Sequence, residues 1–269
     1  MRSVRRYQVR SFEVFLAQVG ADEDKSVVFS SVPAEVDRQS QQLRGVLLRL
    51  GATPSTPVTI LSDGADGPRS LGEAACIGPT SHALDWFHLA MRIQHLAQAA
   101  KGWPTGTPGE CEDNARLIDA VEHIRWRLWH GQVQRALDLI RETLAWLEGM
   151  ADTTPTAEAK ATALLRGLET YVCGQADLII DYATARRRGE PISTATTEST
   201  VQWLLHRRMG ASQQMRWSPR GAHRMLKVRT AVANGTLIDD HVAEIACRRG
   251  GPYVFLKLRP ACLTMFQRA

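Results

Sequence analysis

The sequence predicts a mixed α/β fold, because short β-branched runs alternate with segments of helical periodicity in its first hundred residues. Residues 12–19 and 26–32 are rich in Val and Phe and flank a polar tip, which predicts a hairpin. After Pro33, apolar residues recur at helical spacing as far as Gly51, which predicts an amphipathic crossover helix. Residues 57–61 form a short apolar run, typical of a strand buried on both faces.

A carboxylate follows each of two predicted strands in this part of the chain. Asp63 comes directly after the run at residues 57–61, and Asp85 ends the next short segment, before a helix that is expected from about Ala90. Taken alone, Asp63 is typical of a turn, since Asp-Gly pairs favour turns.

A cluster of Gly, Pro and Thr at residues 102–109 marks a change to an all-helical segment. Apolar residues with periods of three and four on both sides of Gly131 predict an antiparallel helix pair, and a third helix follows to about Tyr182. The segment contains Trp126, Trp129 and Trp146. Basic residues do not gather on one face with these tryptophans, so we expect core packing rather than base stacking.

The basic residues of the chain are concentrated near its C-terminal end. The formal net charge is +5, which allows an acidic partner without requiring one. Between Ser199 and Arg229 there is no Asp or Glu, and an ordinary surface helix carries both signs of charge. We therefore interpret this stretch as a nucleic-acid contact rather than a solvated face. Its basic residues are Arg207, Arg208, Arg216, Arg220, Arg224, Lys227 and Arg229.

Several classes of protein and site are disfavoured. No apolar run approaches the roughly 20 residues of a membrane helix, and the N-terminal residues are basic without an apolar segment, so we expect a cytoplasmic protein with no membrane partner. The five cysteines are scattered without a CxxC pair, so we interpret them as structural thiols. His82, His88 and His95 lie close in sequence but lack the HExxH pattern, which favours structural or DNA-proximal roles over zinc binding.

Four sequence blocks occur in order along the chain. They are VTILSDGADG, HALDWFHLAMRIQHL, ISTATTES and QQMRWSPRGAHRMLKVRTAVANGTL, and the last is the most specific. Together they resemble the transposases of bacterial insertion sequences of the ISKra type, which belong to the acidic-triad, RNase H-like superfamily. The resemblance extends over about residues 12–237.

The resemblance implies an RNase H-like mixed sheet interrupted by an all-helical insertion, and metal-dependent cleavage and strand transfer of DNA. By this similarity Asp63 is the second catalytic acid and Glu198 the third, and the two bind Mg²⁺ or Mn²⁺. Taken alone, Glu198 is an acid favoured by a helix N-terminus. Asp85 is a further catalytic candidate, expected to help hold the site rather than to ligate metal. The basic stretch is expected to contact the backbone of transposon-end and target DNA.

The chain departs from the family pattern at its start. The first acid is expected on an opening strand upstream of the hairpin, yet residues 1–11 contain no Asp or Glu. This central strand is therefore expected to be missing, which leaves the backbone of its neighbours unpaired unless the basic N-terminal residues or another chain fill the gap. We expect a truncated transposase; the alternative is an inactive DNA-binding remnant that regulates an intact element. Gln202 also stands where Asn is expected.

The expected organisation has four parts. Residues 1–101 form the first part of the catalytic core, 102–192 the helical insertion, 193–240 the C-terminal core helices with the basic stretch, and 241–269 a tail without an assigned role. Assembly into a homo-oligomer is left open.

Overall fold

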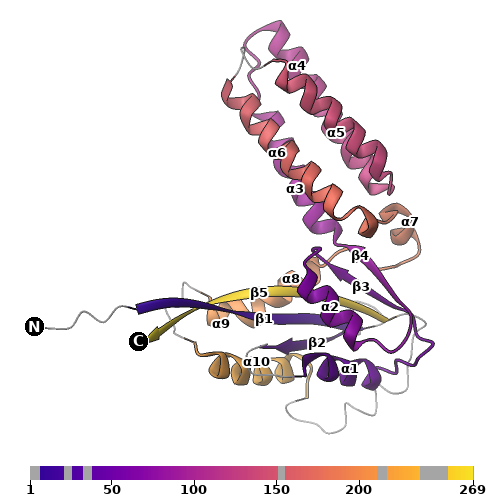
Figure 1. Ribbon diagram of the computed structural model, residues 1–269, viewed down its shortest axis with the longest axis vertical. Helices are drawn as coiled ribbons and strands as arrows, with labels where there is room; N and C mark the ends of the chain where they lie inside the picture. The colour runs from indigo at the N-terminus through magenta and orange to yellow at the C-terminus, as the bar shows by residue number, and fades with distance from the viewer. Residues whose placement is uncertain are drawn as a thin grey trace, which may run out of the picture. The chain divides into compact units, whose positions relative to one another are not determined.

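The computed structural model describes residues 7–20, 26–32, 38–150, 155–210, 217–236 and 254–268 (Figure 1). The protein has a mixed α/β fold, as the alternation of segments predicts. Its chain divides into two compact units, Met1–His82 together with Ser193–Ala269, and Ala83–Ile192. Among the described residues, no helix combines the length and apolar character needed to cross a membrane.

The first unit is built on a five-stranded mixed sheet with the strand order β2-β1-β5-β3-β4. Its strands are β1 (Tyr7–Gly20), β2 (Ser26–Ser31), β3 (Val58–Ser62), β4 (Thr80–Leu84) and β5 (Val254–Arg268). β1 and β2 pair antiparallel, so the predicted hairpin is confirmed. β1 also pairs antiparallel with β5, and β3 runs parallel to β5.

β5 occupies the centre of this sheet, where it lies between β1 and β3 (Figure 1). It is paired with β1 from Tyr7 opposite Arg268 to Gly20 opposite Phe255, and with β3 from Val58 opposite Val254 to Leu61 opposite Lys257. The gap expected between the hairpin and β3 is therefore filled from within the chain. The residues that fill it were expected only as a tail; they take this place because unpaired backbone groups in the middle of a sheet are costly.

Helices cover both faces of the sheet. Side chains alternate along a strand, so Phe15, Ala17 and Val19 of β1 pack with the helices α1 (Gln39–Arg49) and α2 (Asp66–Ala75). Phe12, Val14 and Leu16 pack on the opposite face. That face is covered by α8 (Ala195–Val201), the π-helical turn η3 (Gln202–His206), α9 (Arg207–Met209) and α10 (Pro219–Ala233).

The outer edge of β2 forms hydrogen bonds with side chains of α10 and of the residue that follows it. The Asn234 amide accepts a hydrogen bond from the Val28 N–H and donates one to the Val28 carbonyl, both at 2.8 Å. The hydroxyls of Ser30 and Thr230 lie 2.7 Å apart. These contacts occupy backbone groups that an edge strand would otherwise offer to another chain.

The second unit is a bundle of helices. They are α3 (Trp86–Lys101), α4 (Pro108–Trp129), α5 (Val133–Glu148), α6 (Pro155–Gly174), the short 3₁₀ helix η2 (Ala176–Leu178) and α7 (Tyr182–Arg187). The predicted helix pair is α4 and α5, joined at Gly131, which has a φ of +67°. A Cβ there would lie 3.0 Å from the Asp181 backbone nitrogen, so this turn requires glycine.

The helical unit begins before α3, at Ala83, rather than at residue 102. The reason is the apolar face of α3, since Leu89, Ile93 and Leu96 are buried in the same core as residues of α4, α5 and α6. The loop that follows α3 is a connection within the bundle.

The expectation of core packing is met by two of the three tryptophans of the bundle and fails for the third. Trp129 and Trp146 pack against the core of the bundle, whereas Trp126 is 53% exposed. The cysteines differ in their exposure to solvent: Cys111 and Cys173 are exposed, and Cys76 is half-buried. Cys247 lies outside the described residues.

Candidate functional site

Asp63 lies in the turn that connects β3 to α2. Ile60 and Leu61 of β3 are fully buried, and the strand ends one residue before Asp63. The Asp63 Oδ1 atom accepts a hydrogen bond from the Ala65 N–H at 3.1 Å, and Gly64 provides the turn with a φ of +90°. Side chains alternate along β3, so position 63 lies on the same face of the sheet as Leu61. Val58 and Ile60 lie on the opposite face, which α1 and α2 cover.

Glu198 lies in the first turn of α8. Its backbone N–H donates to the Thr194 carbonyl at 2.9 Å. The hydroxyls of Thr196 and Thr197 donate to Oε1 of Gln18 on β1, at 3.1 and 3.3 Å, and the Gln18 Nε2 donates to the Ser26 hydroxyl at 2.6 Å. The buried Gln18 amide therefore fastens the first turn of α8 to the sheet.

Strand register connects these two places. Lys257 of β5 is opposite Gln18 of β1 and also opposite Leu61 of β3, so the three residues form one row across the sheet. Neighbouring strands lie about 4.8 Å apart, which makes the ends of this row roughly 10 Å apart. The row thus joins the attachment point of α8, next to Glu198, with the strand that leads to Asp63. Sequence reasoning missed Gln18, because an isolated glutamine in a strand carries no motif.

The central strand supplies no acid. β5 contains Lys257, Arg259 and Arg268 and no Asp or Glu. Among the described residues, no group of three or more His, Cys, Asp or Glu side chains could hold a metal ion. Two carboxylates still match Mg²⁺ in chemistry, because this ion prefers oxygen ligands and is commonly held by one or two carboxylates together with water and phosphate oxygens. The carboxylates of Asp63 and Glu198 are therefore of the right chemical type to bind one Mg²⁺ ion, whereas a two-ion arrangement needs more ligands.

Asp85, the further catalytic candidate, lies at the start of α3. Its side chain is fully buried and caps α3, with Oδ1 accepting a hydrogen bond from the Phe87 N–H at 2.9 Å. Its Oδ2 is bonded to the His88 Nδ1. Both carboxylate oxygens are thus engaged at the start of a helix of the second unit, where Asp85 stabilises the helix N-terminus, and its part in catalysis stays a prediction.

The basic residues after Glu198 divide into two groups. Arg207, Arg208, Arg220 and Arg224 are exposed, on α9 and α10, and Arg216 lies outside the described residues. Lys227 donates to the Ser30 carbonyl at 3.3 Å and to the Gln42 side chain at 3.2 Å, and burial lowers its pKa. Lys227 therefore contacts the edge strand and α1, and its contact with DNA stays a prediction.

Arg229 is also structural. Its guanidinium donates to the carbonyls of Leu204 and Trp203 at 2.8 and 2.7 Å and lies over the Trp203 ring. Both carbonyls belong to η3, and π-helical turns bond less regularly than α-helix. Arg229 thus stabilises the irregular turn that follows Glu198.

The three histidines do not act together. The His82 Nε2 lies 3.0 Å from the Glu73 carboxylate, and burial lowers the pKa of His82 while Glu73 partly opposes this effect. His88 is bonded to Asp85, and His95 is exposed.

No protein family, curated protein or solved structure matches the chain.

Proposed function

We propose that the chain is the core of an insertion-sequence transposase that binds DNA and holds a divalent cation with Asp63 and Glu198. One observation carries this proposal: the row from Gln18 through Lys257 to Leu61 links the first turn of α8 with the strand ending at Asp63. The position of β5 adds support, because the family resemblance requires a central strand between the hairpin and the strand of the second acid. A sheet interrupted by a helical bundle, here Ala83–Ile192, is also what the resemblance to the RNase H-like superfamily implies.

In this mechanism the two carboxylates supply hard oxygen ligands, and the exposed arginines of α9 and α10 hold flanking phosphates. A bound Mg²⁺ supplies charge neutralisation at the reacting phosphate. The contribution of the chain is positioning: Gln18 fixes α8, and the turn at Gly64 fixes Asp63. A protein that acts on bacterial DNA in this way works in the cytoplasm.

The test measures metal binding and DNA chemistry separately. Titration calorimetry with Mn²⁺ on the whole chain should show affinity reduced about tenfold or more by Asp63→Asn and by Glu198→Gln, since each removes one of two charged ligands. Asp66→Asn, an exposed acid at the start of α2, is the matched control and should bind like wild type. Equal affinity in all four proteins would refute the assignment.

A second candidate function is a DNA-binding remnant that does not cleave and instead regulates an intact element. It is favoured by the absence of any acid from β5, which leaves the two-ion arrangement short of ligands. Cleavage and strand-transfer assays with Mg²⁺ or Mn²⁺ distinguish the two functions. Turnover that depends on Asp63 and Glu198 supports the transposase, whereas DNA binding without turnover supports the remnant.

A further inference from the structure

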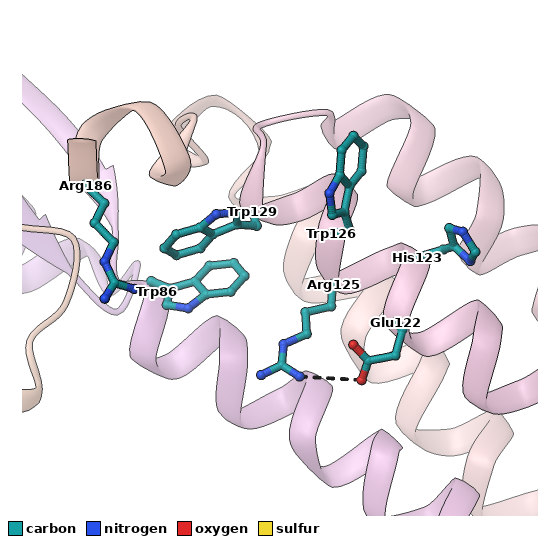
Figure 2. A pocket seen from close by; sticks show the side chains of 7 residues that line it. All are labelled: Trp86, Glu122, His123, Arg125, Trp126, Trp129 and Arg186. Atoms are coloured by element: carbon teal, nitrogen blue, oxygen red, sulfur yellow. Dashed lines mark hydrogen bonds and ion pairs between the residues drawn. The ribbon is translucent and has the colours of Figure 1, made fainter. Parts of the chain in front are cut away.

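The helical bundle contains a cavity of about 720 Å³ at the junction of α3, α4 and α7 (Figure 2). Three tryptophans and two arginines line it, together with Glu122 and His123. This volume lies within the range of small-molecule sites. None of these residues takes part in the site of Asp63 and Glu198.

One wall of the cavity is a rigid aromatic cluster. The ring centroids of Trp86 and Trp129 lie 4.8 Å apart at a steep angle, and both rings contact Tyr182. The buried Tyr182 hydroxyl donates to the Leu84 carbonyl at 3.0 Å, which fixes its ring. A wall held in this way loses little conformational entropy when a planar ligand packs against it.

Trp126 forms a second wall, and it is exposed although its orientation is fixed. It lies one helical turn before Trp129 on α4, and Figure 2 shows the two rings on the same side of that helix. The His130 ring covers one face of the indole at 4.2 Å, and its Nδ1 donates to the Trp126 carbonyl at 2.8 Å. The residue is 53% exposed, so the indole is held in place and still accessible to a ligand.

The cavity also carries positive charge. Figure 2 shows the Arg186 guanidinium of α7 beside Trp86 and the Arg125 side chain of α4 near the tryptophans. Glu122 pairs with Arg125 at 3.5 Å, so two cations face a single acid. Guanidinium groups match phosphate oxygens in geometry, and Glu122 can accept a hydrogen bond from a base amino group.

From these features we propose that the cavity binds a single unpaired nucleotide, with its base stacked on Trp126 and its phosphate held by Arg125 and Arg186. Aromatic walls with adjoining cations suit a planar base that carries an anion. An uncharged aliphatic ligand could not stack on the rings and would leave both arginines without a partner. The nucleotide can be part of single-stranded DNA or free in solution. The first source rests on the proposed function, whereas the site itself depends on neither Asp63 nor Glu198.

The experiment measures the binding of whole-chain protein to a fluorescent single-stranded oligonucleotide, to the blunt duplex of the same length, and to thymidine monophosphate. Trp126→Ala should weaken single-strand binding by about 5- to 150-fold, the loss expected for one stacked base, and should change duplex binding much less. Trp126→Phe, which keeps an aromatic ring, should retain most of the affinity. The double variant Arg125→Ala with Arg186→Ala should also flatten the log-log salt slope by up to about 0.7, the contribution of the one phosphate that both arginines hold.

The controls match the variants in type and charge. Ile118→Ala removes an exposed apolar side chain from α4 outside the cavity, and the pair Arg135→Ala with Arg166→Ala removes two exposed cations from the same bundle. Unchanged single-strand affinity in Trp126→Ala, or equal losses in the controls, overturns the proposal. Binding of the monophosphate as tightly as the oligonucleotide identifies the free nucleotide as the source, and tighter oligonucleotide binding identifies DNA. If the protein binds the monophosphate but no DNA, the nucleotide site is supported and the proposed function is refuted.

Discussion

The attachment of α8 to β1 through Gln18 can be broken by one substitution, Gln18→Leu. Leucine has a similar volume but removes the hydrogen bonds that Gln18 makes with the hydroxyls of Thr196, Thr197 and Ser26. Thr197 is 1% exposed, so its stranded hydroxyl costs about 1–3 kcal/mol, whereas the half-buried Thr196 and Ser26 can bind water and lose roughly 0.5 kcal/mol each. The free energy of unfolding should therefore fall by about 2–4 kcal/mol.

Urea unfolding followed by circular dichroism measures this loss, and calorimetry with Mn²⁺ measures whether Glu198 keeps its position. We expect both the stability and the metal affinity of Gln18→Leu to decrease. Gln41→Leu changes an exposed glutamine of α1 and should alter stability by no more than about 0.5 kcal/mol. If Gln18→Leu behaves like this control, the hydrogen bonds do not hold α8. If stability falls while metal affinity is unchanged, Gln18 does not position Glu198.

Three further predictions concern other parts of the chain. Lys257→Asp puts an acid into the row between Gln18 and Leu61, and Mn²⁺ affinity should rise about tenfold because a third charged ligand becomes available. Neutralising Arg207, Arg208 and Arg220 together should flatten the log-log salt slope of duplex DNA binding by up to about three, near 0.9 for each phosphate contact. Burial lowers the pKa of His82, so below about pH 6.5 the unfolded chain binds more protons than the folded chain. The free energy of unfolding should therefore decrease as the pH is lowered, and His82→Gln should weaken this dependence.

Each of these predictions has a control. Lys257→Asn removes the same positive charge without adding a charged ligand, and an equal gain in affinity would mean that the added carboxylate does not bind the ion. Arg229→Met is a comparison for the arginines, because Arg229 is bound to η3 and its loss should lower stability without flattening the slope. For His82, urea unfolding of both proteins between pH 5 and 7 should give diverging curves, and parallel curves would contradict the role of burial.

Local elements could be predicted because their signals lie within a few residues. The Val and Phe runs around a polar tip indicate the β1–β2 hairpin, and the short apolar run indicates β3. The position of Asp63 after a buried strand and that of Glu198 in a first helical turn are also local, so the sequence was sufficient to predict both positions, while their role as metal ligands stays a prediction. What each residue would contact was not visible at this level.

The remaining features depend on partners that are distant in sequence. The apolar and basic residues alternate at 256–259, which is compatible with a strand, but only pairing with β1 and β3 makes β5 central. Lys227 belongs to an acid-free stretch, yet its contact with Ser30 is decided by the packing of α10 on β2. Trp126 lies two residues from both Ile124 and Leu128, off their buried face of α4, and only the packing of the bundle shows that its own face is left open. Residue spacing determines which side chains share a face of a helix or strand, whereas pairing and packing across the fold determine which faces are buried and which charges are bound.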